Sequence, residues 1–261
     1  MAPLAGATGV TLLVDIGNTR VKWAILHDGA LSCGTPVPHR EQSLQATWPA
    51  MWGHMPPPGG VIVANVAGSA VAASLAAWAS AHWALQPQFI TAMPAACGVT
   101  NGYSEPGQLG VDRWLALIGA RHLKAVAGQH VCVIGCGTAL TVDILSAAGQ
   151  HLGGWIAPGI EMMRQQLSRG TAALSGEFTR QSGGKGLGHS TEEAVMTGIR
   201  QAAAGMVDRA VLTARTLLEQ PPVGVVTGGA ADDLVPFLSS ETVTVPDLVL
   251  RGLAAFVLQR D

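Results

Sequence analysis

The stretch VTLLVDIGNTRVKWAIL, residues 10–26, decides the fold of the first half of this chain. Apolar residues over 11–16 and 21–26 flank a tight Gly-Asn turn. Glycine and asparagine tolerate the left-handed backbone conformations that tight hairpin turns use. The stretch therefore predicts two strands folded back on each other, with Asp15 near the end of the first.

A second stretch, HVCVIGCGTALTVDIL at residues 130–145, repeats this order of apolar strand, glycine turn and apolar strand. Gly137 follows Gly17 at an offset of 120 residues. One interpretation is a duplicated domain whose two turns face each other across a cleft. The other is that two unrelated α/β lobes each contain such a hairpin.

Strands and helices alternate along the rest of the chain. Strands are expected at 61–66 and 89–91 around an alanine-rich helix near 69–81. A further helix is expected from Asp112 to about Val126, after a loop from Gly98 to Gly110. Later strands at 131–134, 140–145, 154–157, 223–226 and 242–245 accompany helices that begin at 159, 191, 231 and 247. This alternation is typical of the α/β class.

Composition excludes several classes of function. A formal net charge of −2 without a run of Lys or Arg argues against nucleic acid as a ligand. The apolar stretches are shorter than the roughly 20 residues that span a bilayer, and no secretory signal is visible, so we expect a cytoplasmic protein without a membrane partner. Four cysteines without metal-ligand spacing predict reduced thiols. A mean hydropathy of +0.33 favours a homo-oligomer.

The segment DIGNTRVK, residues 15–22, suggests phosphate chemistry. Gly17 lets the backbone approach a phosphate, and Asn18 and Thr19 offer donors at the turn. A carboxylate ending a buried strand, Asp15, needs a partner, for which Mg²⁺ carried by a nucleotide is suited. Lys22 can neutralise phosphate charge. An ordinary hairpin with Lys22 in water remains the alternative.

Two later turns add to this pattern. Thr138, after Gly137, offers a hydroxyl and an amide to a phosphate. Gly228 and Gly229 follow a strand end, where a ring or ribose can lie against bare backbone.

Five motifs in a fixed order together resemble those of the type III pantothenate kinases, a family that includes Bvg accessory factors. They are DIGNTRVK (15–22), GVDR (110–113), GTALTVD (137–143), GGWIAPG (153–159) and TGG (227–229). The resemblance implies the acetate kinase, sugar kinase, Hsp70 and actin superfold, with ATP between two ribonuclease H-like lobes. We expect these lobes at residues 1–114 and 115–261.

The resemblance also implies roles for single residues. Asp112 matches the catalytic base, and Asp15 is assigned to Mg²⁺ carried by ATP. Residues matching the ATP-binding segments are Asp15, Ile16, Gly17, Asn18, Thr19, Arg20, Val21, Lys22 and Thr138. Those matching positions used for pantothenate are Tyr103, Gly110, Val111, Asp112, Arg113 and Thr191. The family further implies a homodimer.

Each of these assignments has a structural alternative. Asp112 is also a suitable helix N-cap, and the helix dipole there favours its anion. Arg113 suits a substrate carboxylate but also a surface ion pair. Thr191, followed by two glutamates, is equally suited to beginning the long helix.

One position departs from the family. Many members carry Asp where this chain has Gly135, and that Asp helps bind a monovalent cation, K⁺ or NH₄⁺. Gly135 has no side chain for this role, so the cation is held by other groups or is not required. We expect an ATP-dependent pantothenate kinase. The alternatives are an accessory or regulatory protein of the same fold that acts through a protein partner, and an ATPase or phosphatase of the superfold.

Overall fold

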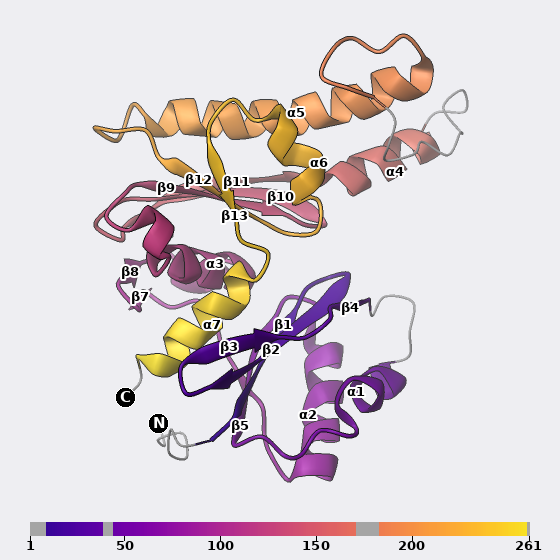
Figure 1. Ribbon diagram of the computed structural model, residues 1–261, viewed down its shortest axis with the longest axis vertical. Helices are drawn as coiled ribbons and strands as arrows, with labels where there is room; N and C mark the ends of the chain where they lie inside the picture. The colour runs from indigo at the N-terminus through magenta and orange to yellow at the C-terminus, as the bar shows by residue number, and fades with distance from the viewer. Residues whose placement is uncertain (1–8, 39–43, 171–182, 260–261) are drawn as a thin grey trace. The chain divides into compact units, whose positions relative to one another are not determined.

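The computed structural model describes residues 9–38, 44–170 and 183–259 and divides the chain into two compact units (Figure 1). The first unit comprises residues 1–122 together with 247–261, and the second comprises residues 123–246. Each unit is built on one mixed sheet.

The first sheet has the strand order β3-β2-β1-β5-β6, with β4 paired to the start of β2. Strands β1, β2 and β3 are antiparallel neighbours, whereas β5 runs parallel to β1 and β6 parallel to β5. The strands are β1 (Thr11–Ile16), β2 (Arg20–His27), β3 (Ala30–Cys33), β4 (Val37–Pro38), β5 (Gly60–Asn65) and β6 (Gln88–Phe89). A small hairpin, β7 (Ala95–Ala96) and β8 (Val99–Thr100), follows them.

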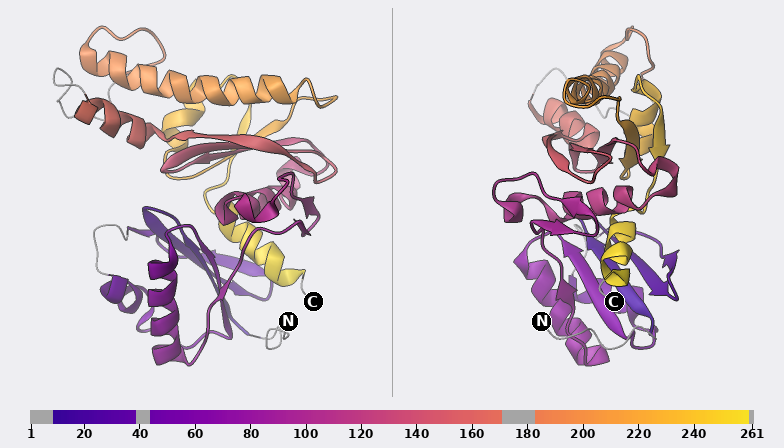
Figure 2. Two further views of the ribbon diagram at one scale, coloured as in Figure 1. Left: turned by 180° about the vertical axis from the view of Figure 1, so that it is seen from behind. Right: turned by 90° about the vertical axis from the view of Figure 1, so that its left-hand side faces the viewer.

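Helices cover both faces of this sheet (Figure 2). Helices α1 (Leu44–Trp52) and α2 (Ser69–Trp83) cover one face, and α3 (Val111–Arg121) and α7 (Leu248–Leu258) cover the other. Alternate residues of β1, Leu12, Val14 and Ile16, belong to the core on the α1 and α2 face, together with four tryptophans of these helices. Because side chains alternate along a strand, Asp15 lies on the α3 and α7 face.

The second sheet has the strand order β11-β10-β9-β12-β13. Its strands are β9 (Val131–Cys136), β10 (Ala139–Leu145), β11 (His151–Pro158), β12 (Val223–Thr227) and β13 (Thr242–Thr244). Helix α5 (Thr191–Ala214) lies along one face, with α4 (Ile160–Gly170) and α6 (Ala231–Leu234) beside it (Figure 1). Three 3₁₀ turns, Pro106–Gln108, Lys124–Val126 and Val235–Phe237, complete the described elements.

The two sheets have the same topology, which confirms the duplication. In each, three antiparallel strands are followed by two parallel ones in the same spatial order. The hairpin loops differ by one residue: Ile16 pairs with Val21, whereas Cys136 pairs with Leu140. The offset of 120 therefore holds up to the glycines, and the second strand of the hairpin follows at an offset of 119.

The division into units differs from the expected boundary between residues 114 and 115. That boundary would cut helix α3, which runs unbroken from Val111 to Arg121. Helix α3 also ends before the expected Val126. The C-terminal helix α7 packs against α3 and belongs to the first unit, a contact between segments far apart in the sequence.

All four cysteines are free thiols, as their spacing predicted. Cys132 and Cys136 are buried, and burial raises the pKa of each thiol to about 12. No helix in the described part of the chain combines the length and the apolar character needed to cross a membrane.

Helices α3 and α7 make their close contact through two glycines. A β-carbon on Gly252 would overlap the carbonyl oxygen of Leu115, and one on Gly119 would overlap that of Leu248. Backbone cannot move aside as a flexible side chain can. The contact therefore requires glycine at both positions.

We expect Gly252→Ala to lower the free energy of unfolding by about 1–3 kcal/mol, because overpacking outweighs the better helix propensity of alanine. Urea unfolding measures this change. Gly60→Ala is the matched control, since a β-carbon there has no neighbour within 4 Å. A Gly252→Ala variant as stable as the wild type would contradict the close packing.

Candidate functional site

The β1–β2 hairpin presents a short turn at the end of the first sheet. Within it, the Gly17 amide donates to the carbonyl oxygen of Arg20 at 3.1 Å. Asn18, Thr19 and Arg20 are exposed, while Ile16 and Val21 at the base are buried. The turn therefore projects polar groups from a rigid base, as a phosphate-binding turn requires.

Asp15 is 7% exposed and pairs across the hairpin with Lys22. Burial raises its pKa to about 6; the positive charge of Lys22 lowers this pKa and the negative charge of Asp112 raises it. Asp15 and Asp112 thus lie near enough to interact electrostatically, although 97 residues separate them. Two neighbouring carboxylates form an acidic place suited to a cation.

Helix α3 presents Asp112 in its first turn. Gly110 occupies the N-cap position and makes no side-chain cap, so the interpretation of Asp112 as the N-cap is wrong. Its Oδ1 instead accepts a hydrogen bond from the Arg113 amide at 2.9 Å. A β-carbon on Gly110 would lie 2.7 Å from that oxygen, so the glycine leaves room for the carboxylate. The positive end of the helix dipole favours the anion here.

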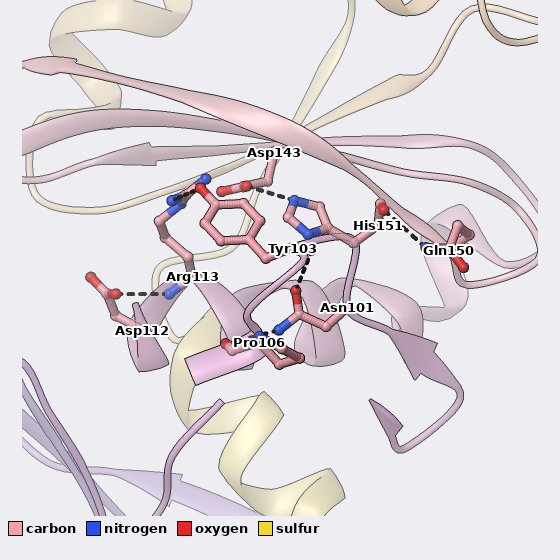
Figure 3. Close-up of polar contacts among 8 residues, drawn as sticks. All are labelled: Asn101, Tyr103, Pro106, Asp112, Arg113, Asp143, Gln150 and His151. Carbon is pink, nitrogen blue, oxygen red and sulfur yellow. Dashed lines mark hydrogen bonds and ion pairs between the residues drawn. The ribbon is translucent and has the colours of Figure 1, made fainter. Parts of the chain in front are cut away.

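Arg113 is 6% exposed, which excludes the surface ion pair considered for it. Its Nη1 donates to the Tyr103 hydroxyl oxygen at 2.9 Å, and its guanidinium lies 5.6 Å from the centre of the Tyr103 ring. Figure 3 shows the two side chains pointing toward each other. The structure thus brings together Tyr103, Asp112 and Arg113, all predicted site residues.

The β9–β10 hairpin is the counterpart of the first, with Gly137 donating to the Ala139 carbonyl oxygen at 3.1 Å. Gly159 donates to the Thr138 carbonyl oxygen at 3.0 Å and leaves no space for a β-carbon. Gly228 has a φ of +105°, and a β-carbon there would overlap the carbonyl oxygen of Cys136. Three of the quoted motifs thus meet at this turn.

Asp143 of the GTALTVD motif is buried and paired. The nearest side-chain atoms of His151 and Asp143, Nε2 and Oδ1, are 2.9 Å apart, and both residues are at most 2% exposed (Figure 3). This pair joins β10 to β11 and gives the carboxylate a partner within the second unit. We interpret it as structural support for the sheet.

Thr191 is the first residue of α5 and is exposed. The capping role belongs to Ser190, whose side chain accepts from the Glu193 amide at 3.2 Å. Glu193 in turn accepts from the His189 amide at 2.8 Å. The helix start is therefore satisfied without the Thr191 hydroxyl.

Gly135 lies in the position of β9 that corresponds to Asp15 in β1. It pairs with Thr141 on β10, and a β-carbon at Gly135 would overlap the Thr141 hydroxyl oxygen. At this shared position the first sheet therefore carries the carboxylate of Asp15, whereas the second carries a glycine next to the hydroxyl of Thr141.

Sequence reasoning missed two features: Asn101 holds the loop before α3, and Gly159 and Gly228 lie against the β9–β10 turn. A signal for Asn101 was present, because asparagine in a loop commonly accepts from the amide two residues later, here that of Tyr103. The contacts of Gly159 and Gly228 with the second hairpin are tertiary and have no local signal.

No group of three or more His, Cys, Asp or Glu side chains suited to a metal ion occurs among the described residues. A single carboxylate fits an ion that brings other ligands with it. Asp15 provides such an oxygen donor, and burial, which disfavours its ionised form, raises its pKa to about 6.

A family model described as type III pantothenate kinase matches residues 11–213. A type III pantothenate kinase from Nitrosococcus oceani is 37% identical over 93% of this chain and 92% of its own. One from Nitrosospira multiformis is 41% identical over 94% and 89%.

Solved structures extend the likeness to the fold. A Campylobacter jejuni protein assigned to the Baf family of transcriptional activators matches with a TM-score of 0.60 and 19% identity, covering 95% of this chain and 98% of its own. MreB 5 of Spiroplasma citri, bound to AMPPNP, matches with a TM-score of 0.55 and 10% identity, covering 96% of each chain. The fold is that of the sugar kinase, Hsp70 and actin superfold, as the motifs predicted.

The buried Asp15 makes a stability prediction. Its native pKa of about 6 exceeds the ordinary value of 3.8, so its stabilising contribution is complete below pH 3.8 and is lost as pH rises through 6. We expect Asp15→Asn to raise the free energy of unfolding at pH 7 by roughly 1–3 kcal/mol, and this gain to fade toward pH 4.

Urea unfolding without Mg²⁺ or nucleotide, repeated between pH 4 and pH 8, measures the gain. Asp232→Asn removes an exposed carboxylate and serves as the control. A gain that is absent at pH 7, or larger at pH 4 than at pH 7, would show that burial does not penalise the Asp15 anion.

Proposed function

The chain belongs to the type III pantothenate kinase family, and we propose that it transfers the γ-phosphoryl group of ATP to pantothenate. The products are ADP and 4'-phosphopantothenate, so the reaction is the first step of coenzyme A biosynthesis. The observation that carries this proposal is the group of Asp112, Arg113 and Tyr103 at the start of α3, with Asp15 on the same face of the sheet.

Asp112 acts as the base. Phosphoryl transfer depends on positioning and charge neutralisation, and needs a carboxylate that orients the attacking hydroxyl and accepts its proton. The Arg113 amide holds one oxygen of Asp112 at 2.9 Å, which fixes the direction of the carboxylate. The positive end of the helix dipole lies beside this carboxylate.

The two glycine turns bind the phosphates of ATP. We assign Gly17, Asn18 and Thr19 with Lys22 to the first turn. We assign Thr138 to the second turn, where its carbonyl oxygen accepts a hydrogen bond from the Gly159 amide. Asp15 would hold the Mg²⁺ of the nucleotide, which neutralises phosphate charge when bound. The ion would also relieve the unfavourable burial of the Asp15 anion.

The carboxylate of pantothenate is assigned to Arg113 and Tyr103. A guanidinium matches a carboxylate in geometry and charge. Gly110 and Val111 line the same helix start. Thr191 is assigned to the same substrate because its hydroxyl is exposed and is not the helix cap.

The regulatory alternative has less support. A protein that acted only through a partner would have no need for a carboxylate held at a helix start beside a buried arginine. An ATPase or phosphatase would use water as the acceptor of the phosphoryl group. Water has no carboxylate to bind, so the Tyr103–Arg113 pair would have no role in such a reaction.

We also propose a homodimer formed through the second unit. The edge strand β11 exposes Leu152, Trp155 and Ile156, the last at 63%. A hollow of about 110 Å³ between β11 and α5 continues this apolar surface toward Leu217. A second copy would remove such apolar area from water.

A cytoplasmic location without nucleic acid or membrane partners fits the net charge of −2.

Mutation of the base tests the proposed function. With Mg-ATP and a panel of acceptor alcohols, we expect ADP release to require pantothenate and to fall in Asp112→Asn by about 10²–10⁴-fold, the usual worth of a general base. Glu105→Gln, at an exposed carboxylate of the preceding loop, should keep wild-type activity. Turnover without pantothenate, or undiminished turnover in Asp112→Asn, would refute the proposal.

Gly135 makes a prediction about cations. Because no carboxylate stands there, we expect similar rates in potassium and in a bulky organic cation. The double variant Gly135→Asp, Thr141→Ala removes the hydroxyl that overlaps a new side chain and should gain dependence on potassium. A steep potassium requirement in the wild type would mean that other groups hold the ion.

A further inference from the structure

Asn101 lies at the centre of the loop that precedes α3 and is 8% exposed. Its Nδ2 donates to the carbonyl oxygens of Met93 at 3.3 Å and Pro106 at 3.2 Å. Its Oδ1 accepts a hydrogen bond from the backbone amide of Tyr103 at 3.0 Å. The backbone amide of Asn101 donates to the carbonyl oxygen of Pro94 at 2.9 Å. One side chain thus ties together three parts of the loop, and Figure 3 shows its contacts with Tyr103 and Pro106.

This loop has little regular structure of its own. Between residues 93 and 110 it contains only the two-residue strands β7 and β8 and one 3₁₀ turn. Side-chain to backbone hydrogen bonds therefore determine where its residues lie. Tyr103 is one of these residues, because its backbone amide donates a hydrogen bond to the Asn101 side chain.

Tyr103 passes this constraint to Arg113. The tyrosine hydroxyl accepts from Arg113 Nη1 at 2.9 Å, and the ring lies against the guanidinium. Arginine side chains have many rotamers, and two such contacts restrict them strongly. The chain of contacts from Asn101 through Tyr103 to Arg113 therefore ends at the residue beside Asp112.

Among side chains of this size, only asparagine can make all of these hydrogen bonds. Its amide donates to two carbonyl oxygens while its oxygen accepts one N–H. Aspartate would keep the acceptor but set a negative charge against the carbonyl oxygens of Met93 and Pro106. Alanine would leave buried polar groups without partners.

We propose that Asn101 is a positioning residue for recognition of the acidic substrate, acting through the Tyr103–Arg113 pair. The inference rests on the proposed function, in which that pair binds the carboxylate of pantothenate. It places part of substrate specificity in a residue that does not itself touch the substrate.

Steady-state kinetics on the full chain test this role. We expect Asn101→Ala to raise the KM for pantothenate roughly tenfold, with little change in kcat or in the KM for ATP. In a Tyr103→Ala background the same substitution should have no further effect on this KM, because the group that it positions is gone. Gln108→Ala, an exposed carboxamide of the same loop, is the control.

A spectroscopic readout separates this inference from the proposed function. Tyr103 is the only tyrosine of the chain, so 3-fluorotyrosine reports on it alone. In Asn101→Ala the fluorine signal should move toward that of the denatured protein, while Gln108→Ala leaves it in place. Asn101→Ser provides a milder variant if the alanine variant fails to fold.

Two results would overturn the positioning role. One is an unchanged fluorine signal in Asn101→Ala. The other is a rise in the KM for pantothenate that is equally large with and without the Tyr103 side chain. A wild-type protein that releases no ADP with pantothenate would instead refute the proposed function, whatever the fluorine signal shows.

Discussion

The burial of the Asp15 carboxylate, with Asp112 near enough to affect its charge, is the constraint on which the proposed site depends. Burial is the main reason that the pKa of Asp15 is raised to about 6; the positive charge of Lys22 opposes this rise, and the negative charge of Asp112 adds a smaller increase. A buried carboxylate is unfavourable as an anion unless a cation lies beside it, and the positive charge of Lys22 only partly offsets the effect of burial on the pKa of Asp15. In the proposed site, Mg²⁺ carried by the nucleotide would supply further positive charge, so ATP binding would draw on an arrangement that lowers stability when no nucleotide is bound.

Duplication gave the chain two sheets of one topology, yet the two have diverged in chemistry. The first sheet carries Asp15 and places Asp112 near it through α3. In the second sheet Gly135 stands where Asp15 stands in the first, and Gly159 and Gly228 bring bare backbone against the turn. In the proposed function, the first unit would supply the charged groups of the reaction, and the second would supply the Thr138 turn for the nucleotide.

Local patterns predicted the hairpins well. Apolar runs on either side of a Gly-Asn turn sufficed for β1 and β2, and their repetition predicted β9 and β10. The predicted substrate residues Tyr103 and Arg113 do touch each other. The place of α7 could not be predicted, because it depends on the close contact of Gly119 and Gly252 with backbone far away in sequence. The helix caps were also misplaced: Gly110, two residues before Asp112, and Ser190, one residue before Thr191, occupy the N-cap positions.

Hydrogen–deuterium exchange during ligand binding tests most directly whether both glycine turns hold the nucleotide. The amides of residues 17–19 and 137–138 would be followed with and without a non-hydrolysable Mg-ATP analogue, in the presence of pantothenate. We predict that exchange slows in both turns together, while the exposed amides of residues 28–30, at the far end of the first hairpin, stay unchanged. Slower exchange in one turn only, or in neither, would contradict a site that draws on both halves of the duplication.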